Sequence, residues 1–254
     1  MAIVTIRELV EAGVHFGHRA SRWNPKMEHF IFGKKNDVHV VDLRQTVRQL
    51  VKASAFLESV GAVGEDILLI GTKRQAKGVV LEEARRIECP HAVERWLGGT
   101  LTNYRTVRLR LRRLQELEAI EAEPGRYNLT KKNLASLARE RRKIRRNLDG
   151  LRKMDRLPGA LVVVDPRREK NAVREAQRLN VPIVAITDTD SDPTAVDYPI
   201  PGNDDAMRSI RVLLGRLGDA FLRGRRKFKA QRGILTEVPA PEAPPAPASV
   251  QTPA

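Results

Sequence analysis

The stretch PGALVVVDPRREKNAVREAQRLNVPIVAITDT, residues 158–189, decides the fold of this chain. Two short apolar runs, 160–165 and 181–187, flank a segment, 169–179, whose apolar residues recur at helical spacing. Strands that are apolar throughout are buried on both faces, and such strands alternating with helices form parallel sheets. The stretch therefore predicts a strand, a helix and a second, parallel strand.

The same alternation extends on both sides of this stretch. An apolar run at 66–71 precedes a helical pattern at 73–87, and a shorter run at 38–41 precedes a helical pattern at 43–60. The last helix is expected at 204–227. We therefore predict an α/β fold, a doubly wound parallel sheet of about five strands with right-handed crossovers.

Residues 102–155 interrupt the alternation, because they contain no strand pattern. Apolar residues recur there at helical spacing on both sides of a turn expected at 123–128. They are Val107, Leu111, Leu114, Leu117, Leu134, Leu137, Ile144, Leu148 and Leu151. This pattern predicts an inserted antiparallel helical hairpin with coiled-coil packing. Residues 102–156 hold 17 Lys and Arg against 7 Asp and Glu, so most of the chain's excess positive charge lies on the hairpin.

The sequence thus divides into three regions. A globular α/β domain is expected from residues 1–101 and 156–234, with the hairpin at 102–155 protruding from it. Residues 235–254 are expected to be a disordered tail, because the last 17 residues hold six Pro and five Ala and cannot build a core. The segment RGRRKFKAQR, residues 223–232, is a basic arm just before this tail.

Composition indicates a nucleic-acid partner. The 254 residues carry a net charge of +15, and Arg outnumbers Lys by 33 to 13. Arg offers a planar fork for phosphate and stacks on bases, although a thermophilic or GC-rich source produces the same bias. The single cysteine, Cys89, excludes a disulfide framework. Because the chain has neither a long apolar run nor a signal-peptide pattern, we expect a soluble cytoplasmic protein without membrane contact.

The segment EAGVHFGHRASRWNPKMEHFIFGKK, residues 11–35, frames a Trp with cations. This arrangement suits stacking on RNA bases together with phosphate contact. The patch comprises Arg19, Arg22, Trp23, Lys26, Lys34 and Lys35. In the alternative interpretation the loop is merely solvated and Trp23 folds back as a lid on the sheet.

Three other segments add RNA-contact candidates: a strand end at 70–77, the start of the hairpin at 95–105, and the basic arm. Ligands of doubly wound sheets bind at strand ends, and free N–H groups at a helix start favour phosphate. The chain lacks GxxxxGK[ST] and GxGxxG, so RNA phosphate is favoured over a nucleotide. The predicted RNA-binding residues are Arg19, Arg22, Trp23, Lys26, Lys73, Arg74, Arg95, Trp96, Asn103, Tyr104, Arg105, Arg108, Arg225, Arg226 and Lys227.

Histidines and aspartates could together hold a divalent metal. The candidates are His15, His18, Asp188, Asp204 and Asp205. Alternatively the histidines bond to the backbone while the aspartates, Asp192 and Asp204 above all, cap helices. No catalytic residue and no cofactor are expected: Cys89 has no orienting acid at a recognisable spacing, and no G-x-S-x-G motif occurs.

Three motifs together resemble the S-two family of bacterial small-subunit ribosomal proteins. They are the segment at 11–35, RWLGGTLTNYRTVR from Arg95, and the stretch at 158–189. The resemblance covers roughly residues 1–235. The matching residues are Gly13, His15, Gly17, His18, Arg22, Trp23, Asn24, Pro25, Trp96, Gly98, Gly99, Thr102 and Asn103.

This resemblance implies a structural ribosomal protein. It would contact ribosomal RNA with both the globular domain and the hairpin, at the junction of head and body on the solvent side. Its neighbours would include the messenger-binding protein S-one, and it would have no small-molecule substrate. A nucleotide-binding α/β enzyme whose basic hairpin recruits RNA is the alternative, but the chain lacks the phosphate loop that would favour it.

Overall fold

The computed structural model describes residues 4–123 and 130–233. The turn expected at 123–128, apart from Glu123, and the tail expected at 235–254 lie outside these ranges.

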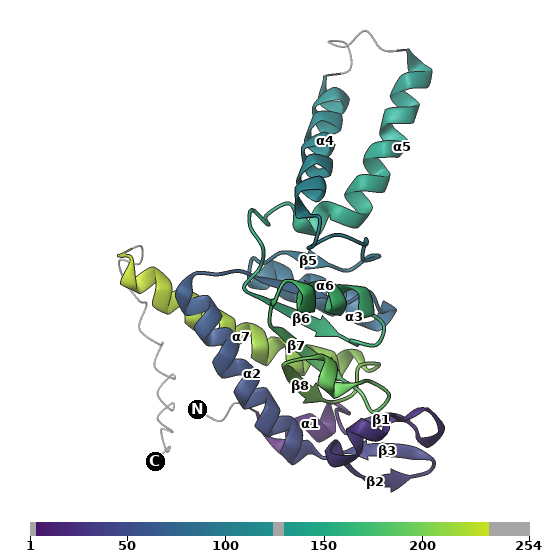
Figure 1. The fold of residues 1–254 in the computed structure, drawn as a ribbon, viewed down its shortest axis with the longest axis vertical. Coiled ribbons are helices and arrows are strands. Elements are labelled where there is room, and N and C mark those ends of the chain that lie inside the picture. Colours follow the sequence, from purple (N-terminus) through teal and green to yellow (C-terminus); the bar gives the residue numbers. More distant parts are fainter. Residues whose placement is uncertain (1–3, 124–129, 234–254) are drawn as a thin grey trace, which may run out of the picture.

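The centre of the molecule is a five-stranded parallel sheet (Figure 1). Its order is β5-β4-β6-β7-β8, so the first two strands of the sheet along the chain are swapped in space. The strands are β4 Ile67–Ile70, β5 His91–Ala92, β6 Ala160–Val164, β7 Ile183–Thr187 and β8 Tyr198–Pro201. The order reverses between β4 and β6, which makes this the topological switch point of the sheet.

Helices cover both faces of this sheet. One face packs against α2 (Leu43–Val63), α3 (Arg74–Arg86) and α7 (Met207–Gln231), and the other against α6 (Lys170–Arg178). Leu69 and Val162 face the first layer, whereas their chain neighbours Leu68 and Leu161 face the second. Burial on both sides explains why the strands are apolar throughout, and the predicted doubly wound α/β fold is confirmed.

The strand expected at 38–41 forms, but it lies outside the parallel sheet. As β3 (Val38–Val41) it pairs with β1 (Phe16–Arg19) and β2 (Ile31–Lys35) in a separate antiparallel sheet. Its residues are mostly half-buried, as one-sided packing requires. Shorter elements precede and link these strands: α1 (Ile6–Glu11), η1 (Ala20–Arg22) and η2 (Pro25–Phe30).

The N-terminal region docks on loops that come late in the chain. The backbone N–H of His18 donates to the hydroxyl of Thr189 at 2.9 Å, and the N–H of Asn24 donates to its carbonyl at 2.8 Å. The N–H of Asn203 donates to the carbonyl of Val14 at 3.0 Å. These bonds fasten the small sheet to the carboxyl edge of the large one.

Helices α2 and α7 cross with their backbones in contact (Figure 1). A Cβ added at Gly61 would lie 2.6 Å from the carbonyl oxygen of Phe221, and a Cβ at Gly224 would collide with the carbonyl oxygen of Glu58. The two glycines therefore set how closely these helices approach.

Helices α4 (Tyr104–Ala122) and α5 (Lys131–Leu148) project away from the sheet side by side (Figure 1). They run antiparallel, because Arg113 near the middle of α4 pairs with Glu140 in α5 at 3.3 Å. Their apolar seam continues without a break into the cluster on the α6 face of the sheet. The predicted coiled-coil hairpin stays a prediction, since its connecting turn lies outside the described ranges.

A last structural element, η4 (Asp149–Leu151), and a short turn, η5 (Pro193–Ala195), complete the described chain. Within the described ranges, every helix is too short or too polar to traverse a lipid bilayer.

Candidate nucleic-acid interface

Lys73, which directly precedes α3, is held by carboxylates. Its Nζ lies 2.6 Å from Asp204, 2.7 Å from Asp205 and 3.7 Å from Asp165. Burial lowers the pKa of Lys73, but the three carboxylates outweigh burial and the pKa is raised. Only 12% of its side chain is exposed. The neighbouring Arg74 is exposed, so the structure separates two adjacent cations that the sequence treats alike.

His18 joins the same network of charges. Its Nδ1 lies 2.9 Å from Asp188, and its Nε2 lies 3.4 Å from Asp205. The hydrogen bond with Asp188 raises the pKa of His18 to about 9, against the opposing effect of burial. Burial, followed by the charges of Asp188 and Asp165, raises the pKa of Asp204 to about 8.

Three of the five metal candidates come together. His18, Asp188 and Asp204 offer ligand atoms that lie within 4.8 Å of one another, and one oxygen of Asp204, Oδ2, is buried without a hydrogen-bond partner. One imidazole and two carboxylates suit a divalent metal such as zinc. The group excludes His15, whose ring packs on Phe16, and metal binding stays a prediction.

The capping interpretation is correct for one aspartate and wrong for the other. Asp192 accepts a hydrogen bond from the N–H of Thr194 and caps η5. The cap residue of α7 is Ala206, not Asp204, and the N–H groups of Asp205 and Ala206 donate instead to the side chain of Asn203. Asp204 is turned toward Lys73 because the ion pair gives its buried charge a partner.

Six of the predicted RNA-binding cations are exposed, and within the described ranges their side chains form no ion pair or hydrogen bond. They are Arg19, Arg22, Arg74, Arg95, Arg105 and Arg226. Their guanidinium groups are free to meet a partner.

Four other predicted cations have partners within the fold. Lys26 binds Asp192 at 2.6 Å, Arg108 binds Asp155 at 2.7 Å, Arg225 binds Asp66, and Lys227 binds Glu58. Surface ion pairs of this kind stabilise a fold by about 0–1 kcal/mol. Such cations can exchange a carboxylate for a phosphate at small cost.

The predicted aromatic and amide contacts serve the fold to differing degrees. Trp23 is half-buried, with its ring 5.2 Å from that of His39. Trp96 is buried, the hydroxyl of Tyr104 donates to the carbonyl of Met154, and the side chain of Asn103 accepts from the hydroxyl of Thr106 at 2.8 Å. Trp96 and Tyr104 thus build the base of the α4–α5 pair.

Glu175 is the residue that the sequence interpretation missed in this region. Its buried carboxylate accepts hydrogen bonds from the indole N–H of Trp96 at 3.0 Å and from the backbone N–H groups of Gly99 at 2.8 Å and Leu101 at 2.9 Å. Burial raises its pKa, but these bonds outweigh burial and lower it. A signal was present: Glu175 falls on the same helical face as the apolar Ala172.

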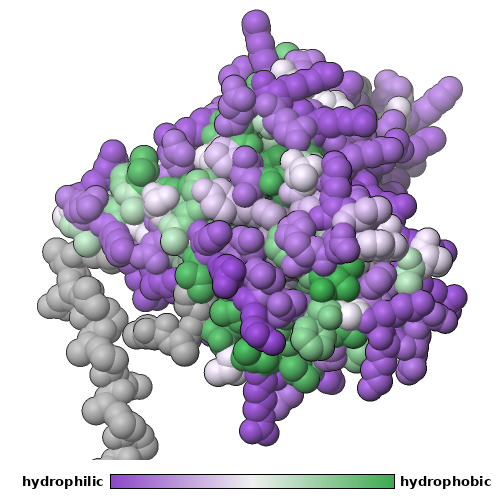
Figure 2. All heavy atoms as spheres, turned by 60° about the horizontal axis from the view of Figure 1, so that its bottom comes forward, coloured by the Kyte–Doolittle hydropathy of each residue, from purple (hydrophilic) through white to green (hydrophobic). Residues whose placement is uncertain are grey.

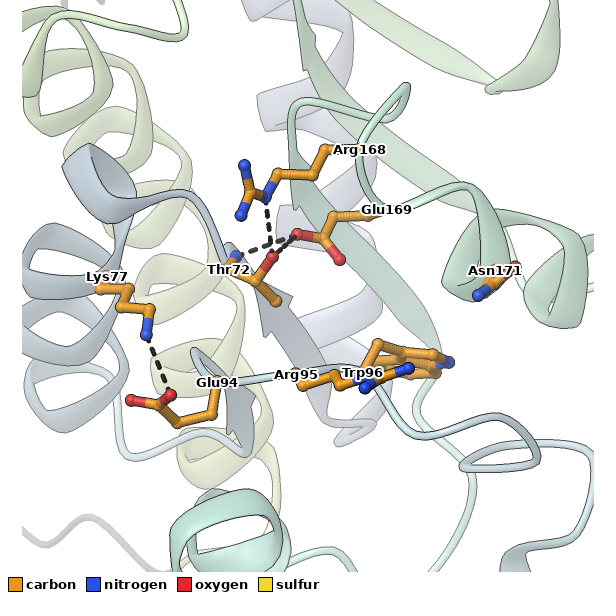
Figure 3. A pocket seen from close by; sticks show the side chains of 8 residues that line it. All are labelled: Thr72, Lys77, Glu94, Arg95, Trp96, Arg168, Glu169 and Asn171. Carbon is orange, nitrogen blue, oxygen red and sulfur yellow. Dashed lines mark hydrogen bonds and ion pairs between the residues drawn. The ribbon is translucent and has the colours of Figure 1, made fainter.

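Arg168 was missed as well. It follows β6 and, with Arg95, lines a cavity of about 480 Å³ at the switch point (Figure 3). We call this cavity the switch-point crevice. Its lining residues are Thr72, Lys77, Glu94, Arg95, Trp96, Arg168, Glu169 and Asn171. Two arginines directly after a predicted strand, in VVVDPRR, could have indicated it.

Comparison with known proteins gives the relationship of this chain. Small ribosomal subunit protein uS2 of Rhodopirellula baltica is 52% identical over 243 residues, which cover 96% of this chain and 93% of that protein. The protein of the same name from Syntrophobacter fumaroxidans is 47% identical over 229 residues, covering 90% of this chain and 84% of that protein. The family model described as Ribosomal protein S2 matches residues 9–224. The chain therefore belongs to the ribosomal protein S2 family.

Proposed function

We propose that this chain, a structural and non-enzymatic protein of the small ribosomal subunit, binds the ribosomal RNA of that subunit at the junction of head and body on the solvent side. Membership of the family places the chain in the ribosome, within the cytoplasm. The alternative of a nucleotide-binding enzyme loses its support, because the family is not enzymatic.

The outward faces of α4 and α5 carry this proposal. Their apolar seam, which includes Leu114 and Ile144, is buried. The acidic Glu118 and Glu140 are already paired with arginines. The cations that remain exposed on the two helices include Arg105, Arg110, Arg112, Arg139, Arg142, Lys143 and Arg145. A rod with cations on its outside and few free acids is suited to phosphate backbones.

The globular domain supplies the second part of the proposed surface. It consists of the unpaired Arg19, Arg22, Arg74 and Arg226, with the exchangeable Lys26, Arg225 and Lys227. Trp23 is included because it is only half-buried. Lys73, Trp96 and Tyr104 support the surface from within the fold.

Filter binding to small-subunit RNA tests the proposal. We expect the triple variant Arg139→Gln/Arg142→Gln/Lys143→Gln to bind at least tenfold more weakly than the intact chain in about 0.1 M salt, because each lost phosphate contact weakens binding. Arg44→Gln/Arg48→Gln/Lys52→Gln removes the same charge from the exposed side of α2 and is the matched control. Equal losses in both variants would show that net charge, not the α4–α5 pair, drives binding.

We also propose that the chain supports the messenger-binding protein S-one, through an apolar patch beside the small sheet. Four large apolar side chains are exposed there: Ile6 (51%), Val10 (47%), Phe16 (53%) and Phe32 (70%). Three of them, Ile6, Val10 and Phe32, line a cavity of about 250 Å³. Figure 2 brings this end of the molecule forward and shows hydrophobic surface among charged side chains. Such patches mark contacts with protein rather than with RNA.

Surface plasmon resonance with purified S-one tests this second contact. Phe32→Ser is expected to weaken S-one binding at least tenfold while leaving RNA affinity unchanged, since a buried Phe stabilises an interface by about 1.5–3 kcal/mol. The matched control is Leu109→Ser, which removes an equally exposed apolar side chain (55%) from α4. Unaltered S-one binding by Phe32→Ser would remove this patch from the proposal.

A further inference from the structure

The switch-point crevice lies where a doubly wound sheet opens. The chain leaves β4 for α3 on one face of the sheet, and leaves the adjacent β6 for α6 on the other face. The two connections diverge and leave a gap at the carboxyl ends of the strands, which is where sheets of this topology bind ligands. The volume of about 480 Å³ lies within the range of about 300–1,000 Å³ typical of ligand pockets.

Two helices begin beside this gap without side-chain caps. Helix α3 follows Lys73 and helix α6 follows Glu169, and neither side chain bonds to its own helix. The free N–H groups of a first helical turn and the helix dipole both favour an anion. Asn171, in the first turn of α6, lines the crevice and adds an amide side chain.

The acids in the crevice already have partners. Glu94 accepts a hydrogen bond from Lys77 at 2.9 Å and lies 3.6 Å from Arg146. Glu169 is buried and accepts from the N–H of Thr72 at 3.0 Å and from its hydroxyl at 2.5 Å (Figure 3). Both carboxylates are therefore occupied within the fold.

The arginines in the crevice lack such partners. Arg95 is exposed and, among the described residues, forms no ion pair or hydrogen bond through its side chain. Arg168 donates only to the neutral hydroxyl of Thr72, at 3.1 Å. In Figure 3 the two arginines come from opposite sides of the crevice, Arg168 from the loop after β6 and Arg95 from the segment after β5. Two guanidinium forks beside two helix starts match the charge and geometry of a phosphate group.

We propose that the switch-point crevice binds a phosphate group of the ribosomal RNA backbone, gripped by Arg95 and Arg168. The identity of the ligand rests on the RNA binding proposed above, whereas the recognition chemistry rests on the crevice alone. A free mononucleotide offers the same chemistry, and the experiment separates the two sources.

The variant Arg95→Gln/Arg168→Gln tests the grip. We expect its affinity for small-subunit RNA to fall at least tenfold in about 0.1 M salt, with a log–log salt slope shallower by about 1–2, because two phosphate contacts are lost. The control is Arg48→Gln/Arg178→Gln, which removes two exposed arginines from outside the crevice. An equal loss in the control overturns the crevice proposal. If the intact chain itself fails to bind RNA, the proposed function fails instead.

A second measurement uses the intact chain, so that it remains decisive even if the double variant folds poorly. Phenylglyoxal modifies accessible arginines, and mass spectrometry identifies which. We expect small-subunit RNA to protect Arg95 and Arg168 at least fivefold, while Arg48 stays reactive. Full reactivity of both arginines in the complex overturns the proposal. Titration with adenosine monophosphate is the last arm: millimolar or weaker binding supports the RNA backbone as the source, and micromolar binding overturns it.

Discussion

Glu175 places a carboxylate in a site that water barely reaches, and four N–H groups converge on it. The indole of Trp96 and the backbone N–H groups of Gly99, Leu101 and Thr102 all donate to it. The segment that it holds leads directly into α4. Its charge therefore determines the direction in which the α4–α5 pair leaves the sheet.

Glu175→Gln should destabilise the fold measurably. The amide keeps the shape but replaces two charged acceptor oxygens by one neutral acceptor and one donor. Hydrogen bonds to a charged group stabilise by about 1.5–3 kcal/mol, which corresponds to a loss of about 3–10 °C in melting temperature for a domain of this size. Thermal melting followed by circular dichroism at pH 7 measures it. The control Glu28→Gln, at an exposed residue, should change the melting temperature by less than about 2 °C.

Lowering the pH should narrow the difference between Glu175→Gln and the original chain. The pKa of Glu175 is held below its ordinary value of 4.5, so its stabilisation is complete above about pH 4.5 and is lost as the pH falls through the lowered value. Melting curves of both proteins from pH 7 down to pH 3 test this. A difference that stays constant over this range would show that geometry, not charge, makes Glu175 important.

Adjacent residues show where sequence interpretation ends at this scale. Lys73 and Arg74 were both predicted to bind RNA, and the motif gave no reason to separate them. Lys73 is instead held by Asp204, which lies 131 residues later in the chain. Spacing within a motif identifies the cations but not the distant carboxylates that the fold brings to them.

At the scale of elements, Gly61 and Gly224 let α2 and α7 touch along their backbones. Gly224→Ala should therefore cost about 3 kcal/mol, the upper end of the usual cost of overpacking, because a carbonyl oxygen cannot move aside as a side chain can. We expect the melting temperature to fall by about 6–12 °C.

Gly215 in the same helix provides the matched control. A Cβ there has nothing within 4 Å, so Gly215→Ala should leave stability unchanged or raise it by up to about 1 kcal/mol through helix propensity. Equal effects of the two substitutions in calorimetry would refute the backbone-contact explanation.

The α4–α5 pair should be separable from the sheet only beyond its base. Trp96, Val107 and Leu151 belong to the same apolar cluster as strand residues such as Leu161. Replacing residues 115–143 with a short Gly-rich loop should leave a cooperatively melting domain that binds small-subunit RNA more weakly. A longer replacement, of residues 107–151, should lower the melting temperature further because it removes part of that cluster.

Circular dichroism and filter binding on both deletions decide the matter. If the short deletion unfolds the chain or binds RNA as tightly as the intact protein, the pair is not a separate RNA-binding appendage. The predicted boundaries of the hairpin, 102–155, stay a proposal until then.

The elements differ in how readily the sequence reveals them. Strands β4, β6 and β7 are apolar throughout and were predicted. Strand β5 has only two residues, and β8, with the sequence YPIP, contains two prolines, which count against a strand. Both are edge strands, where pairing on one side tolerates such sequences. Periodicity gives no register or sheet membership either, which is why β3 was expected in the wrong sheet.

For the whole molecule, RNA affinity should depend steeply on salt. If the six unpaired arginines each neutralise one phosphate, the slope of log affinity against log salt should be about −4 to −5, and cations released from ion pairs would make it steeper. Filter binding between 50 and 300 mM potassium chloride, written here as ~50–300 mM for a conventional range, measures the slope. A slope near zero would mean that phosphate contacts do not dominate.

The docking of the N-terminal region on late loops has a consequence for synthesis. His18 waits for Thr189, 171 residues later, and at translation rates of about 5–20 residues per second this interval is roughly 10–35 s. Until then Val14, fully buried in the finished protein beside Gly202, has no partner there. The small antiparallel sheet can form early, but it can be fastened only when the nascent chain is nearly complete. A growing chain therefore displays an unsealed apolar surface for most of its synthesis, and proteases or chaperones have that long to find it.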